Sequence, residues 1–269
     1  MVKVYMYSDN KAYSFEDLLN IMSILRGENG CPWDREQDHK TIRNNLLEEA
    51  YELADAIDRL DTADMVEELG DLLLQIVFHC QIAKENNAFD IDKVADGICK
   101  KLIYRHPHIF STVKADTSAE VLTNWDKLKN KEKHMSTYTD TLKAVPSAFP
   151  ACLRAQKVQK RASKSGYDFT SLEDTIFNLE GEITELKNAI KNGEKLDAYK
   201  ELGDVLFSAI NIARHLGADA EEELNFATNR FVSRFATAED MAICKGQDLS
   251  QLTDDERDVL WQKAKKSSK

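Results

Sequence analysis

The sequence predicts an all-α protein built from two copies of one helical unit. Glycine and proline are scarce, with ten and four among 269 residues, whereas an all-β fold needs many turns. Apolar residues recur at helical spacing along most of the chain. The same series of motifs also occurs twice in one order, which indicates an internal repeat.

The first copy contains a predicted pair of helices. Apolar residues in the first helix recur on one face, at Leu46, Ala50, Leu53 and Ile57. The polar stretch "DRLDTAD" predicts a connection, with Asp61 or Thr62 as the N-cap of the next helix. That helix is expected from about Met65 to Ala83. Its stretch "DLLLQIVF" is apolar nearly all round, so we expect neighbours from this subunit or another to bury it.

The second copy repeats this plan. The segments "LLEEAYELADAI" and "EELGDLLLQIV" match "LEGEITELKNAI" and "KELGDVLFSAI". Upstream, "CPWDREQD" parallels "SGYDFTSLED"; downstream, "KLIYR" parallels "RFVSR", and Trp125 parallels Trp261. The stretch between the copies is polar, contains Pro146 and Pro150, and lacks helical periodicity. We therefore predict a first domain at 1–130, a linker at 131–148 and a second domain at 149–269.

Each copy carries four carboxylates within otherwise apolar helices. Residues three or four apart share a helix face, so two antiparallel helices would bring the four together. The predicted sets are Glu49, Glu52, Glu68 and Asp71 in the first copy, and Glu182, Glu185, Glu201 and Asp204 in the second. Such an oxygen-rich cage fits Mg²⁺, with Mn²⁺ as a substitute, and four carboxylates suggest more than one ion and an anionic ligand.

Two other interpretations of the carboxylates are less consistent with the sequence. A solvated acidic face would explain one pair, but not the same four positions in both halves. A di-iron site needs Glu-x-x-His motifs, and neither copy has one. His79 has Ile212 at the matching position, so we expect His79 and His215 to be ordinary core or surface histidines.

Basic residues offer phosphate ligands close to these motifs in sequence. Lys101 and Arg105 share one predicted helix face, as do Arg230 and Arg234. The stretch "RAQKVQKRASKSG" in the second copy adds a basic cluster, in which we single out Lys157, Lys160 and Arg161. An ordinary solvated face is an equal alternative for that cluster. The rings of Trp125 and Trp261 could stack on a nucleobase, although core packing is as good an explanation.

Composition narrows the class of partner. The net charge is −11 and the pI is about 5.1, which disfavours nucleic acid and anionic membranes as partners. The five cysteines are scattered without a CxxC motif, which is typical of reduced thiols. No apolar run reaches the roughly 18–20 residues of a membrane span, and the first residues lack the apolar core of a signal peptide. We expect a cytoplasmic location.

The motifs "CPWDREQ", "LLEEAYELADAI", "ELGDLLLQIVFH", "RHPHIF", "LRAQKVQKRAS" and "ELGDVLF" resemble the MazG family of nucleoside triphosphate pyrophosphohydrolases across nearly the whole chain. The family motif is EExxE followed by ExxD. The first copy matches it completely with Glu48, Glu49, Glu52, Glu68 and Asp71. The second copy has Gly181 at the first position and otherwise matches.

This resemblance implies helical units that complete four-helix bundles with a neighbouring unit, commonly in a homodimer. It also implies Mg²⁺-dependent conversion of nucleoside triphosphates to monophosphates and pyrophosphate, with broad tolerance of bases, chiefly in the second copy. Water would attack the α-phosphorus, with Glu182 or Glu185 orienting or deprotonating it.

Three alternatives stay open at this point. The first is a narrower enzyme, either dUTPase-like or phosphoribosyl-ATP-like. The second is a regulator that binds nucleotides or alarmones without turnover, which two intact carboxylate sets disfavour. The third is a structural helical adaptor, which would have no need of duplicated cages.

Overall fold

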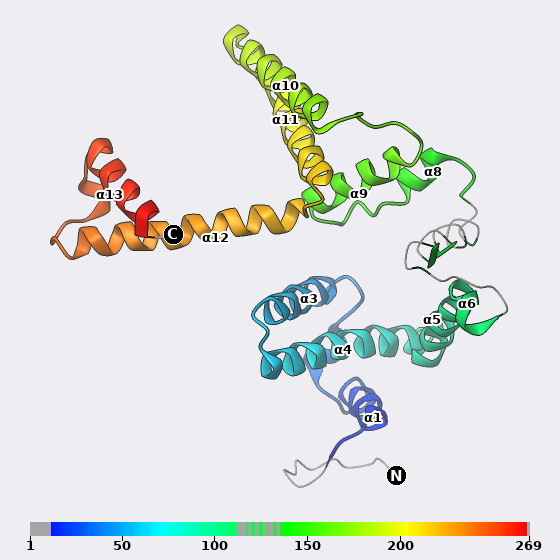
Figure 1. Ribbon diagram of the computed structural model, residues 1–269. Coiled ribbons are helices and arrows are strands. Elements are labelled where there is room, and N and C mark those ends of the chain that lie inside the picture. Colours follow the sequence, from blue (N-terminus) through cyan, green and yellow to red (C-terminus); the bar gives the residue numbers. More distant parts are fainter. Residues whose placement is uncertain are drawn as a thin grey trace. The chain divides into compact units, whose positions relative to one another are not determined.

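The computed structural model describes residues 12–111, 117, 120–121, 124–125, 128, 132 and 135–267, and these form helices without strands (Figure 1). The all-α prediction is therefore confirmed. The chain separates into two compact units, Met1–Lys129 and Asn130–Lys269, and each is described by itself. The bounds predicted for the linker stay a prediction, because some of its positions lie outside the described residues.

The first unit is organised around one long helix, α4, which contacts α1, α3 and α5. Its helices are α1 (Phe15–Leu25), α2 (Pro32–Glu36), α3 (Arg43–Asp58), α4 (Thr62–Glu85), α5 (Ile91–Arg105) and α6 (Pro107–Phe110). Helices α3 and α4 are neighbours in sequence and lie side by side (Figure 1). They are the helices that carry the first set of carboxylates.

A short polar turn connects α3 to α4. The side chain of Asp61 accepts hydrogen bonds from the amides of Ala63 and Asp64, at 3.0 and 3.2 Å, and so caps α4. Asp61 is thus the N-cap that the sequence suggested, and the helix begins at Thr62 rather than Met65. The preceding residue, Leu60, has φ of 54° and lies in the left-handed region.

The second unit repeats the helix pair and extends it. Its elements are α8 (Tyr138–Lys143), α9 (Ala151–Ser163), α10 (Leu172–Asn192), α11 (Lys195–Leu216), α12 (Ala220–Ile243), the 3₁₀ turn η1 (Leu249–Gln251) and α13 (Asp254–Ser267). Helices α10 and α11 form a hairpin, α9 packs on α11, and α13 packs on α12. Gly193 ends α10 with φ of 76°, a left-handed conformation that glycine adopts without a steric penalty.

Each unit contains a small apolar core. In the first unit, buried residues of α1, α4 and the segment before α3 form one cluster: Met22, Ile42, Val77, Phe78 and Ile82. In the second unit, a cluster joins α12, η1 and α13: Ala238, Ala242, Leu252, Leu260 and Ala264. The α10–α11 hairpin contributes no side chain to either cluster.

The carboxylate-bearing helices keep large apolar side chains exposed. Leu69 of α4 is 51% exposed, and Leu202 and Leu206 of α11 are 45% and 57% exposed. Only part of the stretch "DLLLQIVF" is buried, mainly at Val77 and Phe78. The single chain therefore leaves apolar surface of the kind that a neighbouring unit would cover. None of the described helices has the length and apolar character of a membrane span.

Candidate active site

The second unit brings three of its four predicted carboxylates together. Glu182 comes from α10, whereas Glu201 and Asp204 come from successive turns of α11. One carboxylate oxygen from each lies within 4.8 Å of those from the other two. This is the convergence expected from an i, i+3 pair facing a neighbouring helix.

The first unit contains the same arrangement on α3 and α4. Carboxylate oxygens of Glu49, Glu68 and Asp71 lie within 4.8 Å of one another. These three residues are the counterparts of Glu182, Glu201 and Asp204 in the repeat. The duplicated pattern in the sequence thus corresponds to a duplicated cluster in space.

The remaining carboxylates, Glu52 and Glu185, lie outside the tight clusters but influence them. The pKa of Glu68 is raised, chiefly by burial and next by the negative charges of Glu52 and of the other cluster carboxylates. The pKa of Glu201 is likewise raised, chiefly by burial and next by the negative charges of Glu185 and of the cluster carboxylates Asp204 and Glu182. Each set of four therefore acts as one region of negative potential.

Both clusters fit a hard divalent cation. All their ligand atoms are carboxylate oxygens, the donors that Mg²⁺ and Mn²⁺ prefer. In the first unit, Oε2 of Glu68 is buried and has no hydrogen-bond partner among the described residues. A buried charged oxygen without a donor is costly, and a bound cation would remove that cost.

Neutral amides, which the sequence reasoning missed, hold one glutamate in each cluster. Asn178 donates to Oε1 of Glu182 at 3.3 Å and to Oγ of the buried Ser208 at 2.8 Å. In the first unit, the buried Gln75 donates to Oε1 of Glu49 at 3.5 Å. The sequence signal for this contact is the position of Asn178, one helical turn before Glu182 on the same face.

A cavity of about 490 Å³ opens beside the second cluster. Its lining includes Glu182, Glu185, Gly181, Asn178 and Asp168. The cavity places the predicted catalytic glutamates, Glu182 and Glu185, on a surface that a ligand can reach. A Cβ atom built on Gly181 would meet no other atom within 4 Å, so the missing motif glutamate leaves open space.

The predicted phosphate ligands lie on helices that carry none of the carboxylates. Lys101 and Arg105 are on α5, and the guanidinium of Arg105 lies 5.1 Å from the ring centroid of Trp125. Arg230 and Arg234 are on α12, where Arg230 is exposed and the buried Nε of Arg234 lacks a hydrogen-bond partner among the described residues. Their role toward phosphate stays a prediction.

The basic cluster of α9 is divided between two environments. Arg161 donates to the backbone carbonyl of Thr141 and so ties α8 to α9. Lys157 and Lys160 are exposed, and Nζ of Lys157 lies 5.8 Å from the ring centroid of Phe149. Arg161 therefore has a structural contact that the sequence did not indicate, whereas the two lysines remain available to an anion.

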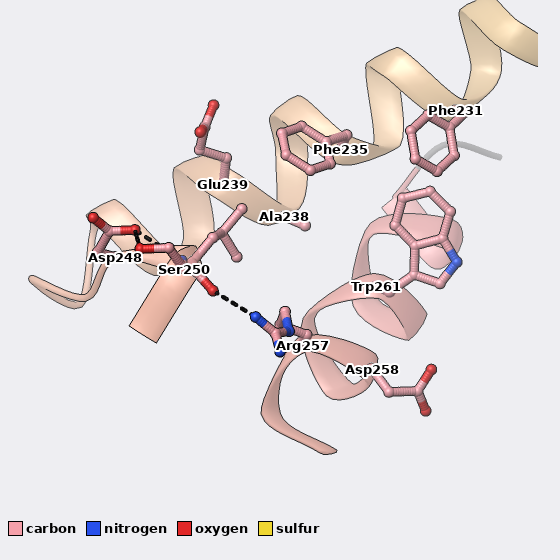
Figure 2. Close-up of a pocket in the computed structure, with 10 residues that line it drawn as sticks. Phe231, Phe235, Ala238, Glu239, Asp248, Ser250, Arg257, Asp258 and Trp261 are labelled. Atoms are coloured by element: carbon pink, nitrogen blue, oxygen red, sulfur yellow. Dashed lines mark hydrogen bonds between the residues drawn. The ribbon is translucent and has the colours of Figure 1, made fainter. Parts of the chain in front are cut away.

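Trp261 lies in a groove between α12 and α13. Its ring centroid is 5.2 Å from that of Phe231, and the two planes are tilted by 49°. Figure 2 shows Trp261, Phe231 and Phe235 around a cavity of about 670 Å³. The tryptophan thus packs on another aromatic ring while still lining an open space, and its proposed contact with a base stays a prediction.

The two histidines expected to be ordinary residues have specific partners. Nδ1 of His79 lies 2.8 Å from Nδ1 of His39, and the rings stack. The pKa of His79 is lowered, chiefly by burial and next by electrostatic repulsion from His39. In the second unit, Nε2 of His215 lies 3.2 Å from Oδ1 of Asp168, which also accepts a hydrogen bond from Arg214.

A family model described as the MazG nucleotide pyrophosphohydrolase domain matches residues 37–110 and again residues 170–237. The first match contains α3 and α4, and the second contains α10 and α11. Each match therefore includes one complete carboxylate set. The two-copy organisation derived from the sequence is confirmed.

Several curated proteins are similar over most of this chain. The "Nucleoside triphosphate pyrophosphohydrolase" of Escherichia coli (strain K12) is 40% identical over 93% of this chain and 96% of its own length. The "Nucleoside triphosphate pyrophosphohydrolase/pyrophosphatase MazG" of Thermotoga maritima is 40% identical over 93% and 95%. The "Uncharacterized protein YabN" of Bacillus subtilis is 38% identical over 96% of this chain and 53% of its own length. The chain therefore belongs to the MazG nucleotide pyrophosphohydrolase family, with two copies of the family domain.

Proposed function

We propose that this protein is an enzyme that hydrolyses nucleoside triphosphates to nucleoside monophosphates and pyrophosphate. The reaction would depend on Mg²⁺, accept ribo- and deoxyribonucleotides with a broad range of bases, and serve to clean the cytoplasmic nucleotide pool. The observation that carries the proposal is the duplicated carboxylate cluster, seen at Glu182, Glu201 and Asp204 and again in the first unit. The names of the relatives support the same reaction.

The carboxylates would hold Mg²⁺ together with the triphosphate. A bound Mg²⁺ supplies neutralisation of phosphate charge and a lower pKa for a coordinated water molecule. The proposed ligands in the second unit are Glu182, Glu185, Glu201 and Asp204, and the corresponding four residues serve in the first. Two carboxylate pairs exceed what one Mg²⁺ usually takes from protein, which favours more than one ion per site.

Glu182 or Glu185 would orient the attacking water and accept its proton. Both line the cavity beside the cluster, where a water molecule and the α-phosphate could meet. The water oxygen bonds to the α-phosphorus, the bond from that phosphorus to the bridging oxygen breaks, and pyrophosphate leaves. The proton removed from water passes to the glutamate carboxylate.

Cations must face the non-bridging oxygens as negative charge develops in the transition state. Arg230 and Arg234, with Lys157 and Lys160, are the candidates in the second unit, and Lys101 and Arg105 in the first. The exposed apolar side chains of α11, such as Leu202 and Leu206, support a homodimer in which a second copy covers the hairpin. The homodimer is part of this proposal.

Product identification tests the proposed reaction. The protein is incubated with ATP and Mg²⁺, and the products are separated by ion-exchange chromatography. Formation of AMP and pyrophosphate in equal amounts is the expected result. ADP with phosphate would contradict the proposal, and nucleotide binding without products would favour a regulator instead. The same assay with other ribo- and deoxyribonucleotides measures the base range.

A further inference from the structure

A pair of histidines joins the segment before α3 to α4 in the first unit. Nδ1 of His39 lies 2.8 Å from Nδ1 of His79, and the two ring planes differ by 12°. A nitrogen–nitrogen distance of this size is that of a hydrogen bond, so one Nδ1 carries a proton and donates it while the other accepts. The contact therefore exists only while at least one of the two rings is neutral.

The turn that contains His39 is anchored at both of its ends. On one side, Nη1 of Arg26 donates to the carbonyl of Gln37 at 3.1 Å. On the other side, Ile42 is 2% exposed and belongs to the apolar core. Between these anchors, the side chain of His39 reaches α4 through His79. The histidine pair thus holds the middle of the turn to the central helix of the unit.

The two rings differ in how freely they can move. His79 lies on α4 between Phe78 and Cys80, which are 4% and 5% exposed. His39 is exposed and lies on the turn. Repulsion between the two rings would therefore displace the turn of His39 rather than α4.

The surroundings offer a counter-charge to one ring only. The pKa of Asp38 is lowered, chiefly by hydrogen bonds from the amides of Thr41 and Lys40 and to a smaller extent by the adjacent His39. The charged groups on the elements packed around α4 are paired with other residues: Arg26 of α1 with Glu85, Glu49 of α3 with Gln75, and Asp90 before α5 with the amide of Lys93. A second positive charge on the pair would meet none of these carboxylates unpaired.

Burial makes a second proton harder to add. It is the main reason why the pKa of His79 is lowered, and repulsion from His39 adds to it. The folded state thus binds this proton less well than the unfolded state does. The contribution to stability is present above the ordinary histidine pKa of about 6.5 and is lost as pH falls through the lowered value.

We propose that His39 and His79 form a clasp that holds the segment before α3 against α4 near neutral pH and opens in mild acid. Helix α3 has no side-chain cap at its start, so its first turn depends on the segment before it. Gln75, one helical turn before His79, donates to Glu49 of the first carboxylate cluster at 3.5 Å. Opening of the clasp would therefore loosen the helix that carries a proposed metal ligand.

This inference is independent of the proposed hydrolysis and concerns the first unit alone. Ile212 stands at the repeat position of His79, so the second unit lacks this pair. The two carboxylate clusters would then differ in their response to acid, because protons would act on the first one through the turn of His39 as well as on its own carboxylates.

Hydrogen exchange of the full-length protein tests the clasp, with mass spectrometry of peptides that cover residues 38–46. Measurements at about pH 7.5 and about pH 5 lie on either side of the ordinary histidine pKa. After correction for the intrinsic exchange rate, protection of this segment should fall about fivefold in acid, the equivalent of one ordinary hydrogen bond.

Two matched substitutions assign the effect to the pair. In His39→Asn the amide can donate to a neutral His79 or, after turning, accept from a protonated one, so the fall in protection should disappear. His108→Asn makes the same exchange on α6 and should keep the wild-type fall. Unchanged protection in the wild-type protein, or an equal fall in His39→Asn, would overturn the clasp.

A titration of the wild-type protein by NMR, with isotope-labelled histidines, keeps the test decisive without any variant. Because the two rings share one proton, His39 and His79 should titrate as a coupled pair in two separate steps, the second of them below the ordinary histidine range. Two independent curves at the ordinary pKa would overturn the proposal.

Discussion

Asn178 and Ser208 are joined by a hydrogen bond of 2.8 Å that links α10 to α11 beside Glu182. The same amide nitrogen donates to Oε1 of Glu182 at 3.3 Å. Because Ser208 is 6% exposed, this network is held in a largely dry environment, where directional hydrogen bonds fix a side chain well. Glu182 is thereby oriented before any ligand arrives.

Substituting Asn178 by alanine should weaken Mg²⁺ activation. Groups that orient metal ligands typically contribute 10- to 100-fold to affinity or activity, so we expect about a tenfold increase in the Mg²⁺ concentration for half-maximal rate. Asn45 occupies the matching position in the first unit, in α3, where its side chain makes no hydrogen bond to the described residues. Asn45→Ala is therefore the control, and an equal effect in both variants would contradict the orienting role.

The two copies should contribute unequally to turnover. Glu52→Gln and Glu185→Gln remove one charge from equivalent positions with little change in shape. We expect the Glu185 variant to lose roughly 10²-fold or more in kcat, as for a general acid–base or metal-site residue. The Glu52 variant should lose much less. Steady-state kinetics with ATP decides, and the reverse order would move the main active site to the first unit.

Magnesium should stabilise the protein most above the pKa values of the clusters. Glu68 and Glu201 have raised pKa values, so their contribution to folding is favourable below the ordinary carboxylate pKa and is lost as pH rises through the folded value. At neutral pH the carboxylates within each empty cluster repel one another, and a bound cation relieves this repulsion. Free Mg²⁺ at 100 times its Kd would add about 2.7 kcal/mol per site.

Thermal unfolding measures this stabilisation with Mg²⁺ or EDTA at several pH values. The rise in Tm caused by Mg²⁺ should be largest near neutral pH and should vanish in acid, where protons replace the cation. A double variant, Glu49→Gln with Glu182→Gln, is the control and should show a much smaller rise. A wild-type Tm that does not change with Mg²⁺, together with activity that persists in EDTA, would contradict both metal sites.

The oligomeric state tests the role of the exposed apolar residues. Light scattering should give twice the chain mass of 30.6 kDa, and Leu206→Glu should shift the protein toward the monomer. Leu60→Glu is a suitable control, because Leu60 is 84% exposed at the turn between α3 and α4. A wild-type mass near that of one chain would contradict the homodimer.

Gly181 should tolerate a side chain. It lies inside α10, and a Cβ there would meet no atom within 4 Å. Gly181→Ala should therefore increase stability by about 1 kcal/mol, the usual difference in helix propensity. Gly181→Glu restores the family motif, and a higher kcat would show that the leading glutamate assists catalysis. Denaturant unfolding and kinetics report the two effects separately. A loss of stability in the alanine variant would show that the position has a tight contact.

The carboxylate clusters were predictable because they depend on local geometry. Helical spacing determines which face Glu201 and Asp204 share, and the short polar turn indicated by Asp61 fixes where α4 begins. Comparison of the two halves then identified the matching residues. These inferences need only the period of a helix and the proximity of consecutive helices.

Contacts between distant segments could not be predicted in this way. The bond from Arg161 to the carbonyl of Thr141 and the packing of Trp261 on Phe231 depend on how α8, α9, α12 and α13 meet. The same is true of the pairing of Asp168 with Arg214. The residue types alone suggested phosphate or base binding for Arg161 and Trp261. Charged and aromatic side chains are equally suited to structural contacts, so residue type does not distinguish the two roles.

The hairpin formed by α10 and α11 has a consequence for the order of folding. All four proposed metal ligands of the second unit lie on two consecutive helices, and left-handed Gly193 lies between them. Closing so short a connection costs little chain entropy, and local contacts form faster than those between remote segments. We expect the cation site to assemble early, before α12 and α13 meet. Mg²⁺ present during refolding would then accelerate the formation of α10 and α11, leaving the distant aromatic contacts to form afterwards.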